Sequence, residues 1–216
     1  VLRLQALPSG AVTLLYAQTA GNLWRSVDDG ATWARADSGL PAARPGSRPL
    51  LDWAAAPADP WTIYAVAQNG EDVRFMQSSD GGAIWRPGGR WTGAAPGAQQ
   101  SYVLAVSAAD AQSVYLAGSG QLWFSATGGR SWRPMGALPD DVSRADRLQL
   151  AVDGEDPALL YVSGGSGLWR SQDQGLSWQA AGDLPPLLET GILVAAHEHR
   201  GLVFAGSRAV VFRSMD

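Results

Sequence analysis

The strongest constraint on the fold is an eight-residue motif that occurs four times along the chain. Its copies read SVDDGATW, SSDGGAIW, SATGGRSW and SQDQGLSW, and they begin at Ser26, Ser78, Ser125 and Ser171. A fifth copy opens as Ser-Met-Asp at Ser214, and successive copies start 52, 47, 46 and 43 residues apart. Self-similarity at a period of this size predicts an array of equivalent structural units.

The residues around each motif repeat as well. A large apolar residue precedes each motif serine by two positions: Trp24, Met76, Trp123, Trp169 and Phe212. Further upstream lies an apolar strand with a central aromatic residue, at Tyr16, Tyr64, Tyr115, Tyr161 and Phe204. Before that strand comes another short one: 2–7, 50–55, 103–107, 148–152 and 192–196. Each unit therefore reads strand, turn, strand, loop, strand, motif turn, strand, which is the size and content of a propeller blade.

The motif resembles the pattern Ser-x-Asp-x-Gly-x-Thr-Trp of the Asp-box, or BNR-repeat, family, and the resemblance covers the whole chain. It implies an all-β fold, a β-propeller of four-stranded antiparallel blades with Asp-box hairpins. We call the four copies boxes 1 to 4. The chain holds four complete blades and three strands of a fifth, approximately 1–48, 49–100, 101–146, 147–190 and 191–216. We expect one domain over 1–216, either a five-bladed ring or part of a larger propeller, and the second is favoured because the chain stops inside a box.

Each type of residue that recurs among the four boxes has a structural explanation. A short carboxylate can accept backbone N–H groups inside a tight turn, and glycine adopts positive φ at little cost. The indole that ends each box is expected to clamp the turn by burial. The residues assigned to this role are Asp28, Gly30, Trp33, Asp80, Gly82, Trp85, Gly129, Trp132, Asp173, Gly175 and Trp178. Box 3 has Thr127 in place of the aspartate, and box 2 has Ile84 in place of the hydroxyl residue.

Strand direction divides the loops into two sets. If four strands alternate, the boxes and the turns between first and second strands share one side, the box face. The longer and more variable loops share the opposite side, the second face, where binding residues are expected because function concentrates on variable loops. Its candidates are Arg44, Arg48, Asp72, Arg74, Arg90, Trp91, Arg144 and Arg147, with Glu71, Asp140, Asp141 and Asp146 on the same loops. Seven tryptophans are explained by packing, which leaves Trp53, Trp61 and Trp91 for ligand stacking.

Composition excludes several classes of function. The net charge is −4 and the 16 basic residues, all arginine, are spread along the chain, which disfavours nucleic acid as a partner. No apolar run reaches the roughly 20 residues of a membrane span. The chain has no cysteine, and the His197-Glu198-His199 triplet falls in a turn without a third ligand, so we expect neither metal nor cofactor. Residues 164–167 (GGSG) form a turn between strands and not a phosphate loop. The arginine, alanine and glycine content indicates a bacterial source.

The resemblance to Asp-box proteins leaves the function open between two classes. The family includes sialidases, xyloglucanases, sortilin-type receptors and photosystem assembly factors, which share blades and not chemistry. The sialidase Arg-Ile-Pro signature has no counterpart here, and Tyr102 has no assignable glutamate partner. We therefore expect a non-catalytic propeller that binds a protein or glycan through the second face. The alternative is a glycoside hydrolase whose remaining catalytic residues lie outside this chain. The resemblance implies an extracellular, cell-surface or periplasmic location, although no signal peptide is visible.

Overall fold

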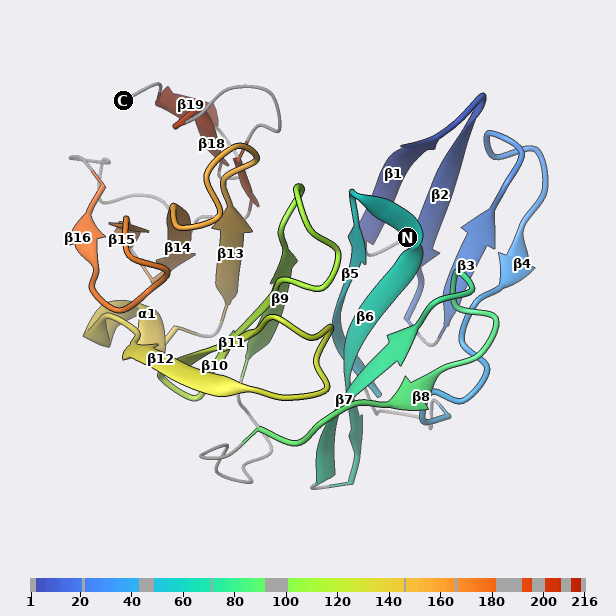
Figure 1. Ribbon diagram of the computed structural model, residues 1–216, viewed down its shortest axis with the longest axis horizontal. Coiled ribbons are helices and arrows are strands. Elements are labelled where there is room, and N and C mark those ends of the chain that lie inside the picture. The colour runs from blue at the N-terminus through green and yellow to red at the C-terminus, as the bar shows by residue number, and fades with distance from the viewer. Residues whose placement is uncertain are drawn as a thin grey trace.

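The protein is a β-propeller built from consecutive antiparallel sheets. The computed structural model describes residues 3–20, 22–42, 49–70, 72–91, 101–145, 147–165, 167–181, 192–195, 201–206 and 211–214. These residues form four four-stranded sheets and one three-stranded sheet. We number the sheets 1 to 5 in chain order. In Figure 1 they follow one another around an arc, with sheets 1 and 5 at its two ends and the fourth strands toward the outside. The predicted fold class, an all-β propeller of four-stranded antiparallel blades, is confirmed.

Every sheet is a meander in which each strand pairs with the next one along the chain. Sheet 1 contains β1 (Arg3–Ser9), β2 (Val12–Gln18), β3 (Leu23–Ser26) and β4 (Ala34–Arg35). Sheet 2 contains β5 (Leu50–Ala56), β6 (Asp59–Asn69), β7 (Asp72–Ser78) and β8 (Arg86–Pro87). Sheet 3 contains β9 (Tyr102–Val106), β10 (Val114–Gly118), β11 (Gln121–Ser125) and β12 (Arg133–Ala137). Sheet 4 contains β13 (Leu148–Val152), β14 (Leu160–Gly164), β15 (Gly167–Ser171) and β16 (Gln179–Ala180), and sheet 5 contains β17 (Ile192–Ala195), β18 (Val203–Gly206) and β19 (Val211–Ser214).

The hydrophobic core is divided into separate clusters between neighbouring sheets and does not form one central cluster. Four clusters of buried side chains join sheet 1 to 2, 2 to 3, 3 to 4 and 4 to 5. Alternate residues of a strand point to opposite faces, so each second strand contributes to the cluster on either side of its sheet. Tyr16 packs toward sheet 2, for example, whereas Ile63 of β6 packs back toward sheet 1. Sheets 2, 3 and 4 are therefore stabilised mainly by their two neighbours, and sheets 1 and 5 by one described neighbour each.

In sheets 1, 2 and 3 the tyrosine of the second strand also ties its sheet to the next one. The hydroxyls of Tyr16, Tyr64 and Tyr115 donate to backbone carbonyls of the following sheet, at O···O distances of 2.9, 2.8 and 2.9 Å. The acceptors are Pro60 at the start of β6 and Ala111 and Pro157 in the turns after β9 and β13. Burial raises the pKa of all three hydroxyls to about 12, so they remain donors over the physiological range.

The structure differs from the sequence expectation in the segment after box 3. A strand after box 3 was expected, but the five-residue length of β12 and the single-turn helix α1 (Asp140–Ser143) that follows it were not. The Gln121 side chain donates to the carbonyls of Met135 and Gly136, which holds β12 beside β11 past the point where the other fourth strands end. In the described residues no helix is long and apolar enough to cross a membrane.

Candidate functional site

The box turns are closed by a hydrogen-bond network that centres on the motif serine. In all four boxes the Ser Oγ accepts the N–H of the glycine four residues later, at N···O distances of 2.9, 2.9, 2.8 and 2.7 Å. In boxes 1, 2 and 4 the same hydroxyl donates to the box aspartate. That aspartate in turn accepts the N–H of Thr32, Ile84 or Ser177. The role of the serine was not predicted, although its position at the start of every copy carried the signal.

Hydrogen bonding lowers the pKa of the box aspartates. The Thr32 hydroxyl, which donates to Asp28 over 2.5 Å, is the largest cause that brings the pKa of Asp28 to about 2. The Ser78 hydroxyl lowers the pKa of Asp80, and the Ser177 hydroxyl lowers that of Asp173. The three carboxylates are therefore ionised and fully engaged within their own turns, which fits a structural role.

The two predicted sides of the propeller are present. Each box turn is hydrogen-bonded to the turn between the first and second strands of its own sheet, or to the first residues of the second strand. The contacts are Thr13 N to Asp29 Oδ1, Gly81 N to Trp61 O, Gly128 N to Gln112 O and Gln174 N to Ala158 O, at 2.7–3.0 Å. These turns and the boxes thus share the box face, and the turns between second and third strands lie at the opposite ends of the strands, on the second face.

The box tryptophans differ in burial, and only Trp85 is buried as predicted, because Trp132 and Trp178 are partly buried and Trp33 is exposed. Trp85 is 3 % exposed, whereas Trp33 is 40 % exposed and so is not the buried clamp that the motif predicts. The reason is that a box tryptophan packs against the preceding sheet: Trp85 Nε1 donates to Ala36 O of sheet 1 over 2.8 Å. In the described structure no sheet precedes sheet 1 around the arc, and Trp33 donates to Gly30 O within its own turn instead.

The tryptophans proposed for ligand stacking are also corrected in part. Trp53 is fully buried between sheets 1 and 2. Trp91 is 9 % exposed, and its ring packs between sheets 2 and 3 against Tyr102 and Trp123, with centroids 6.1 and 6.4 Å apart. Neither can stack on a ligand at the surface. Trp61 is 39 % exposed, but it lies on the box face.

The charged second-face candidates are exposed where the structure describes them. Asp72 and Arg74 stand beside the β6–β7 turn and form an ion pair with each other at 2.5 Å. Arg144 follows α1 and Arg147 precedes β13. Arg90 follows Gly89, whose N–H donates to box 3 at Gly129 O, so it lies close to box 3. Arg44 and Arg48, with Glu71, Asp146 and residues 197–199, lie outside the described residues.

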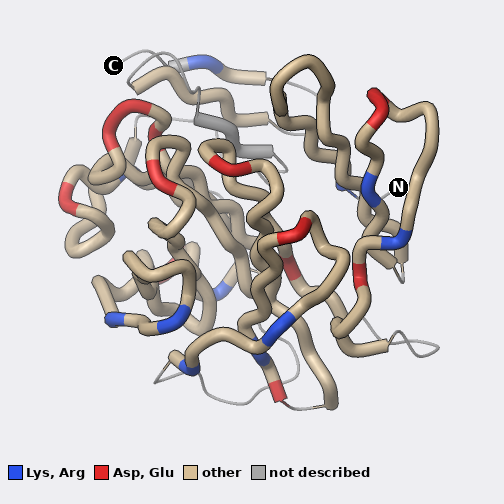
Figure 2. The backbone as a smooth tube through the Cα atoms, turned by 45° about the vertical axis from the view of Figure 1, so that its right-hand side comes forward, with Lys and Arg blue, Asp and Glu red and all other residues tan. Residues whose placement is uncertain are grey.

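Helix α1 is part of the second face beside the two arginines. Asp141 Oδ2 accepts the indole N–H of Trp169 in β15, and the tips of the β10–β11 and β14–β15 turns lie against the helix at Gly120 and Gly165. Arg144 and Arg147 thus stand next to a segment that is fixed to sheets 3 and 4. Figure 2 shows basic and acidic residues distributed along the described chain and not gathered in one patch.

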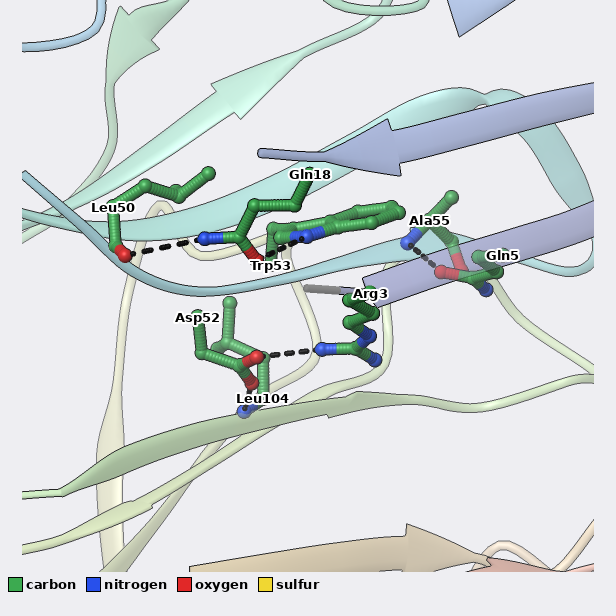
Figure 3. Close-up of polar contacts among 8 residues, drawn as sticks. All are labelled: Arg3, Gln5, Gln18, Leu50, Asp52, Trp53, Ala55 and Leu104. Carbon is green, nitrogen blue, oxygen red and sulfur yellow. Dashed lines mark hydrogen bonds and ion pairs between the residues drawn. The ribbon is translucent and has the colours of Figure 1, made fainter. Parts of the chain in front are cut away.

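The strongest polar cluster that the sequence did not reveal lies at the first strands of sheets 1, 2 and 3 (Figure 3). Asp52 of β5 forms an ion pair with Arg3 of β1 at 2.5 Å, and its other oxygen accepts the N–H of Leu104 of β9 at 2.7 Å. The Arg3 guanidinium also lies over the ring of Trp53, 5.1 Å from its centroid. One carboxylate therefore connects three sheets.

Two glutamines extend this cluster. Gln18 accepts the indole N–H of Trp53 at 3.0 Å and donates to Leu50 O, and Gln5 exchanges two hydrogen bonds with the backbone of Ala55. Figure 3 shows these side chains of sheet 1 reaching across to β5. Burial is the largest cause that raises the pKa of Asp52, and Arg3 is the largest of the opposing influences. Because both Asp52 oxygens are occupied, the arrangement fits a structural tie better than a proton-transfer group.

A pocket of about 370 Å³ lies on the opposite side of the molecule from the predicted binding face. It is lined by Arg133, Pro134, Met135, Ala158, Asp173, Gln174 and Leu176, from β12, box 4 and the adjoining turn of sheet 4. The Arg133 guanidinium in it donates to the Gln174 side chain and covers the ring of Phe124. In the part of the chain that is described, no group of three His, Cys, Asp or Glu side chains could hold a metal ion.

Comparison with known proteins supports the fold alone. No family model and no curated sequence matches this chain. Among solved structures, it resembles a GH74 enzyme of Niastella koreensis (TM-score 0.70, 17 % identity, 99 % of this chain and 28 % of that one). It also resembles the GH74 xyloglucanase of Xanthomonas campestris (0.63, 21 %, 100 % and 30 %) and the extracellular domain of a B. thetaiotaomicron protein (0.61, 14 %, 97 % and 27 %). The chain thus spans under a third of the length of these structures.

Proposed function

We propose that this chain is an Asp-box propeller that recognises a protein or glycan through its second face and performs no chemistry. The box geometry supports the Asp-box assignment, because serine, aspartate and glycine make the same bonds in boxes 1, 2 and 4. We assign residues 1–216 to one propeller domain. An extracellular, cell-surface or periplasmic location is proposed with it, supported by the extracellular domain among the structures of similar fold.

The main support for a binding function is that nearly all described carboxylates already have hydrogen-bond or ion-pair partners. Hydrolysis of a glycosidic bond needs two carboxyl groups that face each other across about 5–10 Å. Among the described acidic side chains, only Asp140 and Glu155 make no hydrogen bond or ion pair. Asp140 lies in α1 on the second face, and Glu155 lies in the turn after β13 on the box face. The described residues therefore offer no facing pair of uncommitted carboxylates.

The second face offers a rigid platform with charge at its surface. Arg144 and Arg147 are exposed and are not paired with an acidic side chain among the described residues. Exposed arginine on a loop held by packed sheets is suited to bind carboxylate, sulfate or phosphate groups of a partner. We expect these two residues to contribute most to recognition. Arg74, in β7 of sheet 2, is already held in an ion pair with Asp72.

A binding assay with matched charge reversals tests this function. The chain is screened on a glycan array and against immobilised host proteins, and affinities of hits are measured for Arg144→Glu/Arg147→Glu. We expect affinity to fall about tenfold or more, since reversal of two interface charges costs at least 1.4 kcal/mol. The control is Arg86→Glu/Arg130→Glu, which reverses two exposed charges at box-face positions. Equal losses in both variants, or none in the first, would place recognition elsewhere.

A second candidate, glycoside hydrolysis, is favoured by one residue. A general acid in a hydrolase needs a carboxyl with a raised pKa, and Asp52 has one. The structures of similar fold also include GH74 enzymes, one of them a xyloglucanase. Aryl glycosides and xyloglucan are the substrates to assay, with Asp52→Asn as the variant. Turnover that disappears in this variant while its thermal unfolding is unchanged would favour the hydrolase over the binding propeller.

A further inference from the structure

The interface between neighbouring sheets is built in the same way three times. Each box tryptophan of sheets 2, 3 and 4 turns toward the preceding sheet. Trp85 donates to Ala36 O, the ring of Trp132 meets the ring of Phe75 edge-on at 4.9 Å, and Trp178 packs into the cluster between sheets 3 and 4. A box tryptophan is thus one half of a contact whose other half belongs to the sheet before it.

Backbone groups complete this contact. The carbonyl of Ser38, after β4, accepts the N–H of Trp85 at 2.8 Å. Gly89, after β8, donates to Gly129 O of box 3 at 2.7 Å, and Gly136 of β12 donates to Gly175 O of box 4 at 2.9 Å. The partner of each box is therefore the fourth strand of the preceding sheet together with the residues that follow that strand.

Sheet 1 has the box side of this interface, but no described sheet supplies the opposite side. Leu15 of β2 is only partly buried, whereas its equivalents Ile63 and Leu160 are fully buried. Leu4 is 61 % exposed and Trp33 is 40 % exposed on this side of the sheet. The indole of Trp33 occupies Gly30 O at 3.2 Å, and this is the acceptor that Gly89 and Gly136 reach in boxes 3 and 4. We call this side of sheet 1, with Leu4, Leu15 and Trp33, the open face.

We propose that the open face is the docking surface of a further four-stranded blade of the same polypeptide. The three occupied interfaces define the chemistry of the occupant: an apolar sheet whose fourth strand and following residues carry free backbone groups for the box. Sheet 5 does not provide this, because its described part has three strands, β17, β18 and β19, and stands at the other end of the arc (Figure 1). The proposal rests on the repeated interface and is independent of the proposed function.

Residue-resolved oxidation of tryptophan tests the proposal. Hydroxyl-radical footprinting with mass spectrometry compares the 216-residue chain with the native gene product. Trp61 is the internal control, since it is 39 % exposed, as Trp33 is at 40 %, but lies on the box face of sheet 2. We expect the two indoles to oxidise at similar rates in the 216-residue chain. In the gene product Trp33 falls to the rate of Trp85, which is 3 % exposed, while Trp61 is unchanged.

Two outcomes would overturn the proposal. The first is that Trp33 oxidises as fast as Trp61 in the gene product. The second is that Trp33 becomes protected in the 216-residue chain as its concentration rises and that Leu4→Glu removes this protection, because the occupant would then be a second copy. Leu4→Glu in the gene product is a further check, for which we expect faster oxidation of Trp33 with no change at Trp61.

Discussion

At the scale of single residues, a box tryptophan matters according to what it packs against and not according to the motif that contains it. Trp33 and Trp85 end equivalent boxes, but Trp33 is 40 % exposed, whereas Trp85 is 3 % exposed and lies between two sheets. The indole N–H of Trp85 is bonded to a neighbouring sheet, and that of Trp33 is bonded within its own turn. The two residues therefore differ in how much of the fold they hold together.

Replacement of these tryptophans measures the difference. Trp85→Ala is expected to lower the free energy of unfolding by about 3–5 kcal/mol, the range for large-to-small changes of buried aromatic residues. Trp33→Ala is expected to cost less, about 1–2 kcal/mol, since 40 % of the Trp33 surface stays in contact with water. Urea denaturation followed by circular dichroism gives both values. Equal costs would contradict the exposure that the structure assigns to Trp33.

The box aspartates give stability a dependence on acid. Their folded pKa values are lowered, that of Asp28 to about 2, below the unfolded value of about 3.9. This contribution is present above about pH 4 and is lost as the pH falls through about 2. Asp52, whose folded pKa is raised, has the opposite sign: its contribution to stability decreases as the pH rises through its folded pKa. Acidification from pH 4 to pH 2 is expected to lower the free energy of unfolding less in Asp173→Asn than in the wild type. Urea titrations at each pH measure this free energy. A steeper loss in the variant would reverse this assignment.

The residues that the sequence identified and those that it missed differ in the range of their contacts. The box bonds join residues two to four positions apart, so a motif of eight letters contains all of them. Arg3 and Asp52 are 49 positions apart, and Leu104 is 52 positions beyond Asp52. Nothing in the local pattern pairs them, because they meet only when three sheets are assembled. The burial of Trp91 was missed for the same reason.

At the scale of elements, each hairpin is closed by a network that differs slightly from box to box. In box 1 the Thr32 hydroxyl donates to Asp28, and in box 4 Ser177 donates to Asp173. Box 2 has Ile84 at this position, 50 % exposed, so Asp80 keeps the Ser78 hydroxyl as a donor but lacks the second hydroxyl donor that Asp28 and Asp173 have. The strands and hairpins were predictable because apolar alternation and turn residues are local; β12 and α1 were not, since contacts to Gln121 and to neighbouring turns hold them.

A reciprocal exchange tests the hairpin network. Ile84→Thr restores the missing donor and removes an exposed apolar side chain, so we expect the protein to gain about 0.5–1 kcal/mol of stability. Thr32→Ile makes the opposite change in box 1 and is expected to lose a similar amount. Thermal unfolding of both variants and of the wild type provides the comparison. A gain in both variants would indicate that apolar contact, and not the hydroxyl, sets the stability of the turn.

The tie between sheets 1, 2 and 3 is tested at Asp52. Asp52→Ala removes the partner of Arg3 and of the Leu104 N–H together, and we expect a loss of about 1–3 kcal/mol. This is below the range for fully buried pairs because the Arg3 side chain is 38 % exposed. Asp52→Asn keeps an acceptor for the N–H and should lose less, as judged by urea denaturation. A loss in Asp52→Asn as large as in Asp52→Ala would assign the effect to the ion pair alone.

At the scale of the whole molecule, the sheets form a chain of neighbours and not a body with one core. The clusters link sheets 1 to 2, 2 to 3, 3 to 4 and 4 to 5, and each inner sheet is covered on both sides. Sheet 1 is covered on one side, since its open face exposes Leu4 and Trp33. Stability in such an array depends on the interfaces that each unit makes with its neighbours, so the units at the ends are the least protected.

Hydrogen exchange should therefore follow position along the arc. We expect amides of β2 in sheet 1 and β18 in sheet 5 to exchange before those of β6, β10 and β14, although all five are second strands in the middle of equivalent sheets. Local opening exposes an end sheet at the cost of one interface, whereas opening of an inner sheet breaks two. Peptide-resolved exchange with mass spectrometry gives the order, and Trp33→Ala serves as a control that should leave β10 unchanged. If all five strands exchange together, the five sheets unfold as one cooperative unit, and the inter-sheet clusters are strong enough to make the end sheets equivalent to the inner ones.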